Sequence, residues 1–163
     1  MCCIVEPTAT LDIKPDPRFD ELETRMAELP QVRLPLNHLF TPGLYIREAF
    51  LPAGTCCTSK IHKTEHPFVI SMGRVTVWSG IPGEAPQEFG APYTGITKPG
   101  TRRVIHAHED TIWSTFHPTN ETDIAKIEDE IIFKHDDHLP FSISAFGEVV
   151  EKPIAPELQN AEH

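Results

Sequence analysis

The run His62-Lys63-Thr64-Glu65-His66 brings together residue types that bind metals and move protons. On a helix, two histidines at this spacing bind one zinc ion while the glutamate beside them acts as a general base. The flanking residues are β-prone and Pro67 follows at once, so this helical arrangement is not expected. On an extended strand the two histidines lie about 13 Å apart, which is too far for one metal ion. They can share an ion only if the chain bends between them, and Pro67 with the polar residues 63–65 favours a bend.

Short strands dominate the region that must position these side chains. Residues 43–117 contain about seven short runs rich in Thr, Val and Ile, separated by turns rich in Pro and Gly, and this pattern predicts an antiparallel sandwich or barrel. We therefore expect three parts. These are a lead-in with a short helix over 1–42, a β-barrel over 43–117, and a helix followed by an extended arm over 118–163.

Two amphipathic helices are expected outside the strands. The first spans residues 19–29 and should pack on the domain. Its apolar stripe consists of Leu22, Met26 and Leu29. The second is expected over roughly 122–134, with Thr122 or Asp123 as its cap, and should pack on the barrel exterior or across a dimer. Its apolar stripe consists of Ile124, Ile127 and Ile131.

The stretch 52–73 (PAGTCCTSKIHKTEHPFVISMG) resembles the first signature of the cupin superfamily. Gly54 fits the opening glycine of that signature. His62 falls on the second histidine of its pair, and His66 takes the position of its carboxylate. Lys60 stands where the first histidine is usual, so the chain keeps the framework and departs from it at the ligand positions.

Residues 98–103 (KPGTRR) resemble the second cupin signature, and Arg103 occupies the position where a histidine is usual. The resemblance covers roughly residues 44–117 and extends to small single-domain cupin-like proteins of unassigned function, some of them phage-encoded. It implies a mostly β fold, an antiparallel double-stranded β-helix or jelly-roll barrel with a short N-terminal and a C-terminal helix. It also implies a metal site near Gly100, with His62 and His66 as ligands and Zn, Fe, Mn or Ni as the metal.

The third ligand is chosen from an expected hairpin formed by the strands 102–108 and 111–117. Pairing these two strands directly places His117 at the end near Gly100, where the site is expected, and His106 near the turn. The predicted metal ligands are therefore His62, His66 and His117, with His106 as the alternative third ligand.

Two hypotheses about function follow. The first is a small metal-dependent enzyme that acts on a small anionic molecule, with Lys60 and Arg103 as substrate-binding residues. Glu65 and Tyr93 are the candidates for proton transfer, and whether the chain is an enzyme stays open. The alternative is a non-catalytic cupin-like binding protein, or a structural subunit of a larger assembly such as a phage assembly, whose histidines are core residues or vestigial ligands.

Composition narrows the range of partners. The chain of 163 residues has 14 basic and 24 acidic side chains, and its formal charge of −10 repels nucleic acid and anionic membranes. No apolar run approaches the roughly 20 residues that span a bilayer, and the N-terminus has no signal-peptide pattern. We therefore expect a cytoplasmic protein (host cytoplasm if phage-encoded) with a small-molecule ligand. The four cysteines, in two adjacent pairs, are expected to be free thiols.

The sequence also predicts that the chain assembles with copies of itself. A small barrel leaves sheet edges that need covering, and the segments 1–42 and 135–163 are long enough to reach a second subunit. We therefore predict a homo-oligomer, at least a dimer.

Overall fold

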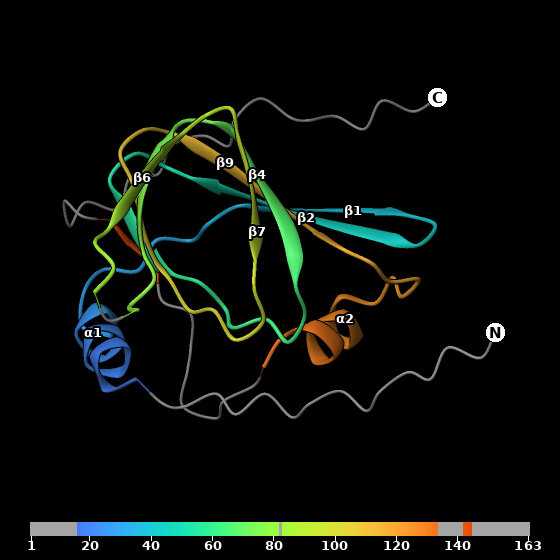
Figure 1. The fold of residues 1–163 in the computed structure, drawn as a ribbon, viewed down its shortest axis with the longest axis horizontal. Coiled ribbons are helices and arrows are strands. Elements are labelled where there is room, and N and C mark those ends of the chain that lie inside the picture. The colour runs from blue at the N-terminus through green and yellow to red at the C-terminus, as the bar shows by residue number, and fades with distance from the viewer. Residues whose placement is uncertain (1–15, 82, 134–141, 145–163) are drawn as a thin grey trace.

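Two antiparallel sheets of five strands each face one another and make up most of the described structure (Figure 1). The computed structural model describes residues 16–81, 83–133 and 142–144. The first sheet has the strand order β1 (Leu36–Thr41), β2 (Leu44–Leu51), β9 (Thr111–His117), β4 (His66–Met72) and β7 (Tyr93–Thr97). The second has the order β10 (Ser142–Ser144), β3 (Thr55–Thr58), β8 (Val104–Ala107), β5 (Arg74–Trp78) and β6 (Gln87–Gly90).

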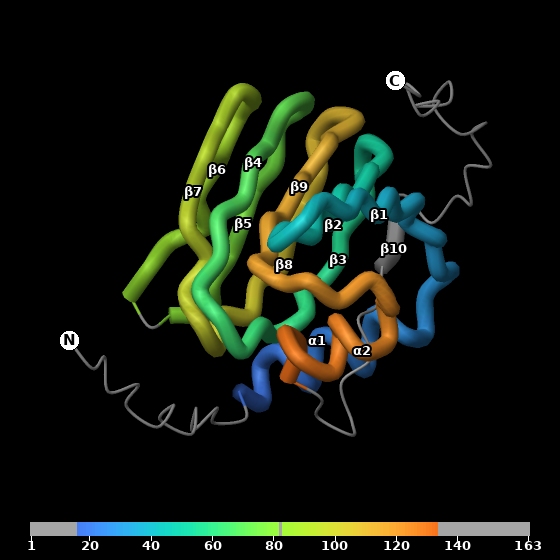
Figure 2. The backbone as a smooth tube through the Cα atoms, turned by 90° about the vertical axis from the view of Figure 1, so that its right-hand side faces the viewer, coloured from blue at the N-terminus to red at the C-terminus, as the bar shows by residue number. Residues whose placement is uncertain are grey.

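Strands that follow one another in the chain mostly lie opposite each other in the two sheets. β2 faces β3, β4 faces β5, β7 faces β6 and β9 faces β8 (Figure 2). The chain therefore crosses between the sheets at most of its turns, and most hydrogen-bonded neighbours are distant in sequence. This topology is an antiparallel double-stranded β-helix. It confirms the predicted fold class, with one helix before the strands and one after most of them.

Two glycines of the first signature sit at such crossings. Gly54 follows β2 with φ +80°, and Gly73 joins β4 to β5 with φ +88°, a backbone conformation that favours glycine. A side chain on Gly73 would also collide with the backbone of Asp110 and Thr111. Glycine is therefore required there by both conformation and space.

The predicted pairing of residues 102–108 with 111–117 is wrong. β8 is hydrogen-bonded to β3 and β5 in one sheet, and β9 is hydrogen-bonded to β2 and β4 in the other. The turn between them carries the chain from one sheet to the facing one. Both strands present apolar side chains inward, Ala107 and Trp113 among them, and each sheet covers the inner face of the other.

Alternate residues of the facing strands build the barrel core. Val75 and Val77 on β5 and Ile105 and Ala107 on β8 are buried, whereas the residues between them are partly exposed. The same cluster contains Leu51, Cys57, Phe68, Ile70 and Trp113. Four buried polar side chains lie at the end of the barrel where β4 begins and where β3, β7 and β9 end. These are Thr58, His66, Thr97 and His117, whereas Thr55 and Thr111 are buried at the opposite end.

The first helix, α1 (Pro17–Ala27), packs through a face that differs from the predicted one. Its buried residues are Phe19, Glu23 and Met26. Of the predicted stripe, only Met26 is fully buried, and Leu29 is 49% exposed. The cause is Arg102, a buried cation whose guanidinium lies 2.6 Å from Glu23 and 2.9 Å from Asp20. Because a charge removed from water needs a partner, the acidic residues face the barrel.

The second helix, α2 (Ile124–Ile131), covers the end of the barrel where the buried polar residues gather (Figure 1). Asp123 is the cap, since its carboxylate accepts a hydrogen bond from the N–H of Ala125 at 3.0 Å. The helix packs on the barrel end, and the apolar face begins one turn later than predicted because Ile124 is 38% exposed. The buried cluster consists of Tyr45, Ile127, Ile131 and Ile132.

Strands β1 and β10 join the sheets from outside residues 43–117, and the division of the chain at 42 and 117 stays a prediction. Cys56 and Cys57 are free thiols, as predicted, whereas Cys2, Cys3 and most of the predicted C-terminal arm lie outside the described residues. Neither of the two helices described is long and apolar enough to cross a bilayer.

Candidate metal centre

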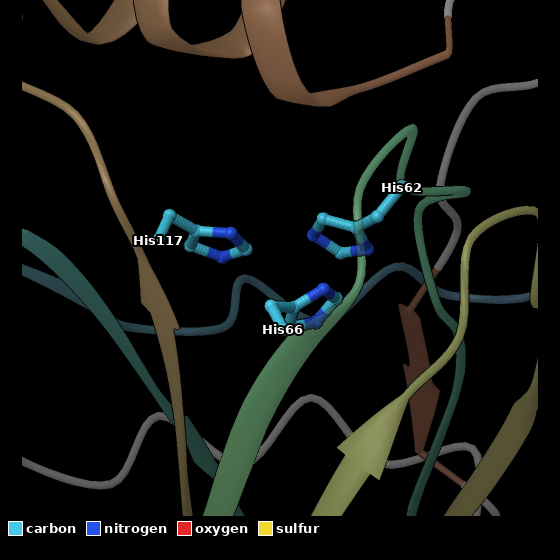
Figure 3. A group of neighbouring side chains, drawn as sticks. All are labelled: His62, His66 and His117. Atoms are coloured by element: carbon cyan, nitrogen blue, oxygen red, sulfur yellow. The ribbon is translucent and has the colours of Figure 1, made fainter. Parts of the chain in front are cut away.

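Three buried imidazole rings point toward one another beneath α2 (Figure 3). They belong to His62, His66 and His117, which are 8%, 2% and 0% exposed. The ring of His66 has its centroid 4.2 Å from that of His62 and 4.5 Å from that of His117. One ring nitrogen from each histidine lies within 4.8 Å of the other two. Among the described residues, no other group of three or more His, Cys, Asp or Glu side chains meets in this way.

The sheet positions two of the three rings. His66 begins β4 and His117 ends β9, and these strands are antiparallel neighbours. Phe68 pairs with Thr115, so the next inward pair in this register is His66 with His117. Both side chains therefore point into the barrel at adjacent positions of one sheet.

The third ring, that of His62, comes from the connection between β3 and β4. Residues 61–63 pair with residues 131–133, at the C-terminal end of α2, through two backbone hydrogen bonds of 2.8 Å. The N–H of Gly100 donates to the carbonyl of His62 at 2.9 Å. The chain bends between His62 and His66, as predicted, and the packing of α2 holds the bend in place.

Hydrogen bonds orient the rings of His66 and His117. Nδ1 of His66 donates to the backbone carbonyl of Thr64 at 3.2 Å, because a carbonyl can only accept. Nε2 of His117 lies 3.1 Å from the hydroxyl of Thr115, which gives its own proton to the carbonyl of Arg47 at 3.3 Å. That hydroxyl therefore accepts the Nε2 proton of His117. Each ring keeps its other nitrogen free of a proton.

The remaining nitrogens fit a metal ion. His62 makes a hydrogen bond to the backbone of Lys60, and its Nε2 is buried without a partner among the described residues. Nδ1 of His117 is also buried and has no hydrogen-bond partner among the described residues. Burying an unpaired polar atom costs about 1–3 kcal/mol, and a metal ion shared by the cluster would satisfy both nitrogens.

Burial holds the three histidines in the neutral form. Loss of water lowers the pKa of His62 to about 2 and that of His117 to about 3, and the neighbouring His66 adds to both shifts. The pKa of His66 is lowered by burial, against the hydrogen bond to Thr64. Neutral imidazole is the form that binds metals, so the cluster can accept a divalent ion at neutral pH without losing protons.

Positive charge lies beside the cluster. Nζ of Lys60 is 2.5 Å from Oε1 of Glu128, and Nη1 of Arg47 is 3.9 Å from the same oxygen. Two cations and one carboxylate leave one net positive charge. Both cations line a cavity of about 430 Å³ that reaches His62. Its apolar walls include Leu34, Leu51, Ile105 and Trp113.

The other predicted site residues do not join the three rings, although Arg103 bonds to Thr97, the cross-strand partner of His66, and its charge helps to lower the pKa of His66. Arg103 and Tyr93 line a second cavity, which His62 does not reach. Glu65 is exposed and lines neither cavity. His106 lies on β8 in the opposite sheet, where its ring contacts that of His108 at 4.7 Å.

Three residues beside the cluster were not singled out from the sequence. Arg47 shares the inward face of β2 with Tyr45, so strict alternation along that strand is a signal that could have found it. Thr115 could have been found in the same way, two residues before His117. Glu128 belongs to an acidic stretch that reads as a solvated helix face, and no local signal identifies it.

Neither a protein-family model nor a curated protein sequence matches this chain. Similar solved structures include a cupin-2 domain containing protein from Shewanella frigidimarina, with 9% identity, a TM-score of 0.43, and coverage of 60% of this chain and 92% of that chain. A double-stranded β-helix domain protein from Klebsiella pneumoniae has 14% identity, a TM-score of 0.45, and coverage of 59% and 88%. KdgF from a Halomonas species has 14% identity, a TM-score of 0.45, and coverage of 56% and 84%. A similarity to phage proteins stays a prediction.

Proposed function

We propose that this chain holds a divalent transition-metal ion on His62, His66 and His117 and takes a small anionic molecule in the adjoining cavity. The observation that carries the proposal is the pair of buried, unpartnered nitrogens in a cluster whose rings are oriented from outside. Three neutral imidazoles suit Zn, Fe, Mn or Ni and leave coordination positions open. An ion bound there would polarise a carbonyl or activate water or dioxygen.

The charges of the cavity support an anionic substrate. Lys60 and Arg47 line it, and their shared partner Glu128 neutralises only one of the two. None of the described residues that line this cavity is acidic, although the whole chain carries a formal charge of −10. A small anion would therefore bind to Lys60 and Arg47, with its apolar part against the wall that includes Leu51 and Trp113.

Elemental analysis of the protein, purified without added metal, tests this proposal. We expect a stoichiometric transition metal in the wild-type chain and its loss in His62→Ala. His106→Ala is the matched control, because it removes the same side chain from the opposite sheet, and it should keep the metal. Circular dichroism and thermal unfolding establish that both variants fold. A wild-type chain that takes up none of Zn, Fe, Mn and Ni from added salts would refute the proposal.

Binding without catalysis is the second candidate, and one observation favours it. Neither Glu65 nor Tyr93, the two candidates for proton transfer, lines the cavity that reaches His62. Metal-loaded protein incubated with small carboxylates and phosphates distinguishes the two functions. A new product that His62→Ala does not form supports an enzyme, whereas bound metal with unchanged anions supports a non-catalytic binding or structural role.

A further inference from the structure

A second cavity, of about 290 Å³, lies between β4, β6 and β7. It is separate from the cavity beside the histidine cluster, although Trp113 belongs to the walls of both. Phe68 and Trp113 stack with centroids 4.6 Å apart and their planes 10° from parallel. Phe89 and Tyr93 form a further aromatic pair with centroids 4.5 Å apart. Flat aromatic side chains therefore make up much of this wall.

Arg103 is the half-buried cation of this aromatic cavity, and the exposed Lys98 also lines it. Its guanidinium carbon lies 5.2 Å from the ring centroid of Phe68, and Nη1 donates to the hydroxyl of Thr97 at 2.9 Å. No ion pair with Arg103 is formed within the described part of the chain. Glu84, the acidic residue at the rim of the cavity, instead accepts a hydrogen bond from Ser79 at 2.9 Å.

The neighbouring residue, Arg102, differs from Arg103 in its ion pairing. Arg102 is bound by two carboxylates, those of Asp20 and Glu23. Arg103 is partly withdrawn from water, its guanidinium donates to the hydroxyl of Thr97 and lies over the ring of Phe68, and it pairs with no carboxylate among the described residues. The chain has a formal charge of −10, so a half-buried guanidinium with no carboxylate partner makes this cavity a local region of positive charge in an acidic protein.

The chemistry of the ligand follows from these two features. A guanidinium has five N–H donors in one plane, so after the bond to Thr97 it can still hold a carboxylate through two hydrogen bonds. Aromatic walls favour a flat apolar body through stacked or edge contacts. The volume lies at the lower end of the range for small-molecule sites, which suits a ligand of one ring.

We propose that this cavity is a second binding site, for a flat organic anion such as an aromatic carboxylate. Arg103 binds the carboxylate, and the rings of Phe68, Phe89, Tyr93 and Trp113 contact the flat body. None of the three histidines lines this cavity, so the site can form without a metal ion in the cluster. The metal proposal and this one can therefore fail separately.

Calorimetric titration of the full chain with benzoate tests the site, in buffer with and without EDTA. We expect benzoate to bind in both buffers, because none of the proposed metal ligands lines this cavity. Cyclohexanecarboxylate, which has the charge without the flat ring, and benzyl alcohol, which has the ring without the charge, should each bind at least about tenfold more weakly. Phosphate binding as tight as benzoate would overturn the proposal in favour of a simple anion site.

Two further measurements place the ligand. Arg103→Gln should weaken benzoate binding at this cavity at least about tenfold, whereas Lys126→Gln, which removes an exposed cation that lines neither cavity, should leave it unchanged. Intermolecular nuclear Overhauser effects in the wild-type protein should connect benzoate ring protons with Phe89 and Tyr93, and they stay informative if the Arg103 variant does not fold. Contacts with Leu34 instead, or no binding of benzoate at millimolar concentration, would overturn the assignment.

Discussion

His66 and His117 are cross-strand neighbours whose ring centroids lie 4.5 Å apart, one at the start of β4 and the other at the end of β9. The register of one sheet sets this pair. The third ring, that of His62, depends on a loop that pairs with the residues after α2. The proposed metal site is therefore positioned by the register of one sheet and, independently, by the loop of His62. Substitutions can alter these two parts of the structure one at a time.

Replacing Thr115 with Val should weaken metal binding about 10- to 100-fold. The new side chain has nearly the same shape but cannot accept the Nε2 proton of His117, so the ring loses the bond that orients it. Affinity can be measured by competition with a chromophoric chelator. Thr76→Val is the matched control, because the hydroxyl of Thr76 bonds to His108 at 2.7 Å, on the other sheet. Equal losses in both variants would rule out a specific role for Thr115.

Replacing Ile131 with Ala should destabilise the protein by about 2–5 kcal/mol and also weaken metal binding. Ile131 is buried against Tyr45, and the residues that follow it hold the loop of His62. Urea unfolding measures the first effect and chelator competition the second. Ile124→Ala removes the same side chain from a more exposed position of α2, so it should change stability by less than about 1 kcal/mol. Wild-type metal affinity in a destabilised Ile131→Ala protein would contradict the role assigned to α2.

Replacing Glu128 with Gln should weaken the binding of a divalent metal roughly 5- to 10-fold and strengthen that of a small anion. Burial opposes ionisation of Glu128, but the hydrogen bond from Lys60 prevails and its pKa lies below the usual value. Without this carboxylate, Lys60 and Arg47 repel the metal more and attract the anion more. Glu130→Gln changes the same charge at an exposed position of the same helix and should do neither. Changes of the same sign for metal and anion would exclude this electrostatic explanation.

The metal-free protein should lose stability as the pH falls below about 6.5. Unfolded histidines bind protons near that pH, whereas burial lowers the pKa of His62 to about 2 and that of His117 to about 3. The unfolded state therefore binds more protons than the folded state at every pH between these values, and protonation favours unfolding. Each of the two histidines contributes up to about 1.4 kcal/mol per pH unit in that window. Urea unfolding at pH 7.5, 6 and 5 measures the slope, which should be smaller in His117→Gln than in His106→Gln. Similar slopes in the two variants would show that burial of His117 is not its source.

Sedimentation velocity at micromolar concentration tests the predicted assembly. β1 is an edge strand of its sheet, and Leu39 and Phe40 on it are each 39% exposed, so this edge offers backbone and apolar groups to a second copy. We expect a mass of at least twice 18.3 kDa. A single species near 18.3 kDa would contradict a dimer.

The choice of His117 over His106 shows how far local sequence reasoning reaches. The predicted hairpin pairs 102–108 with 111–117 in one sheet, which is wrong. It still led to the histidine that meets His62 and His66, because two strands joined by a tight turn run antiparallel whether they pair or face each other. The end of the barrel at which His117 lies was therefore predictable, whereas the sheet that contains its strand was not.

The alternation of apolar residues, the turns and the bend before Pro67 are properties of neighbouring residues, so the β fold, the helices and the meeting of His62 with His66 were predictable from the sequence alone. The face of α1 that is buried, the sheet to which β9 belongs and the charges of Arg47 and Glu128 beside the cluster were decided only by the tertiary structure. In a double-stranded β-helix most hydrogen-bonded strands are distant in sequence. A local pattern states which face of a strand or helix is apolar, but it does not state which distant residue will cover that face or bind its charge.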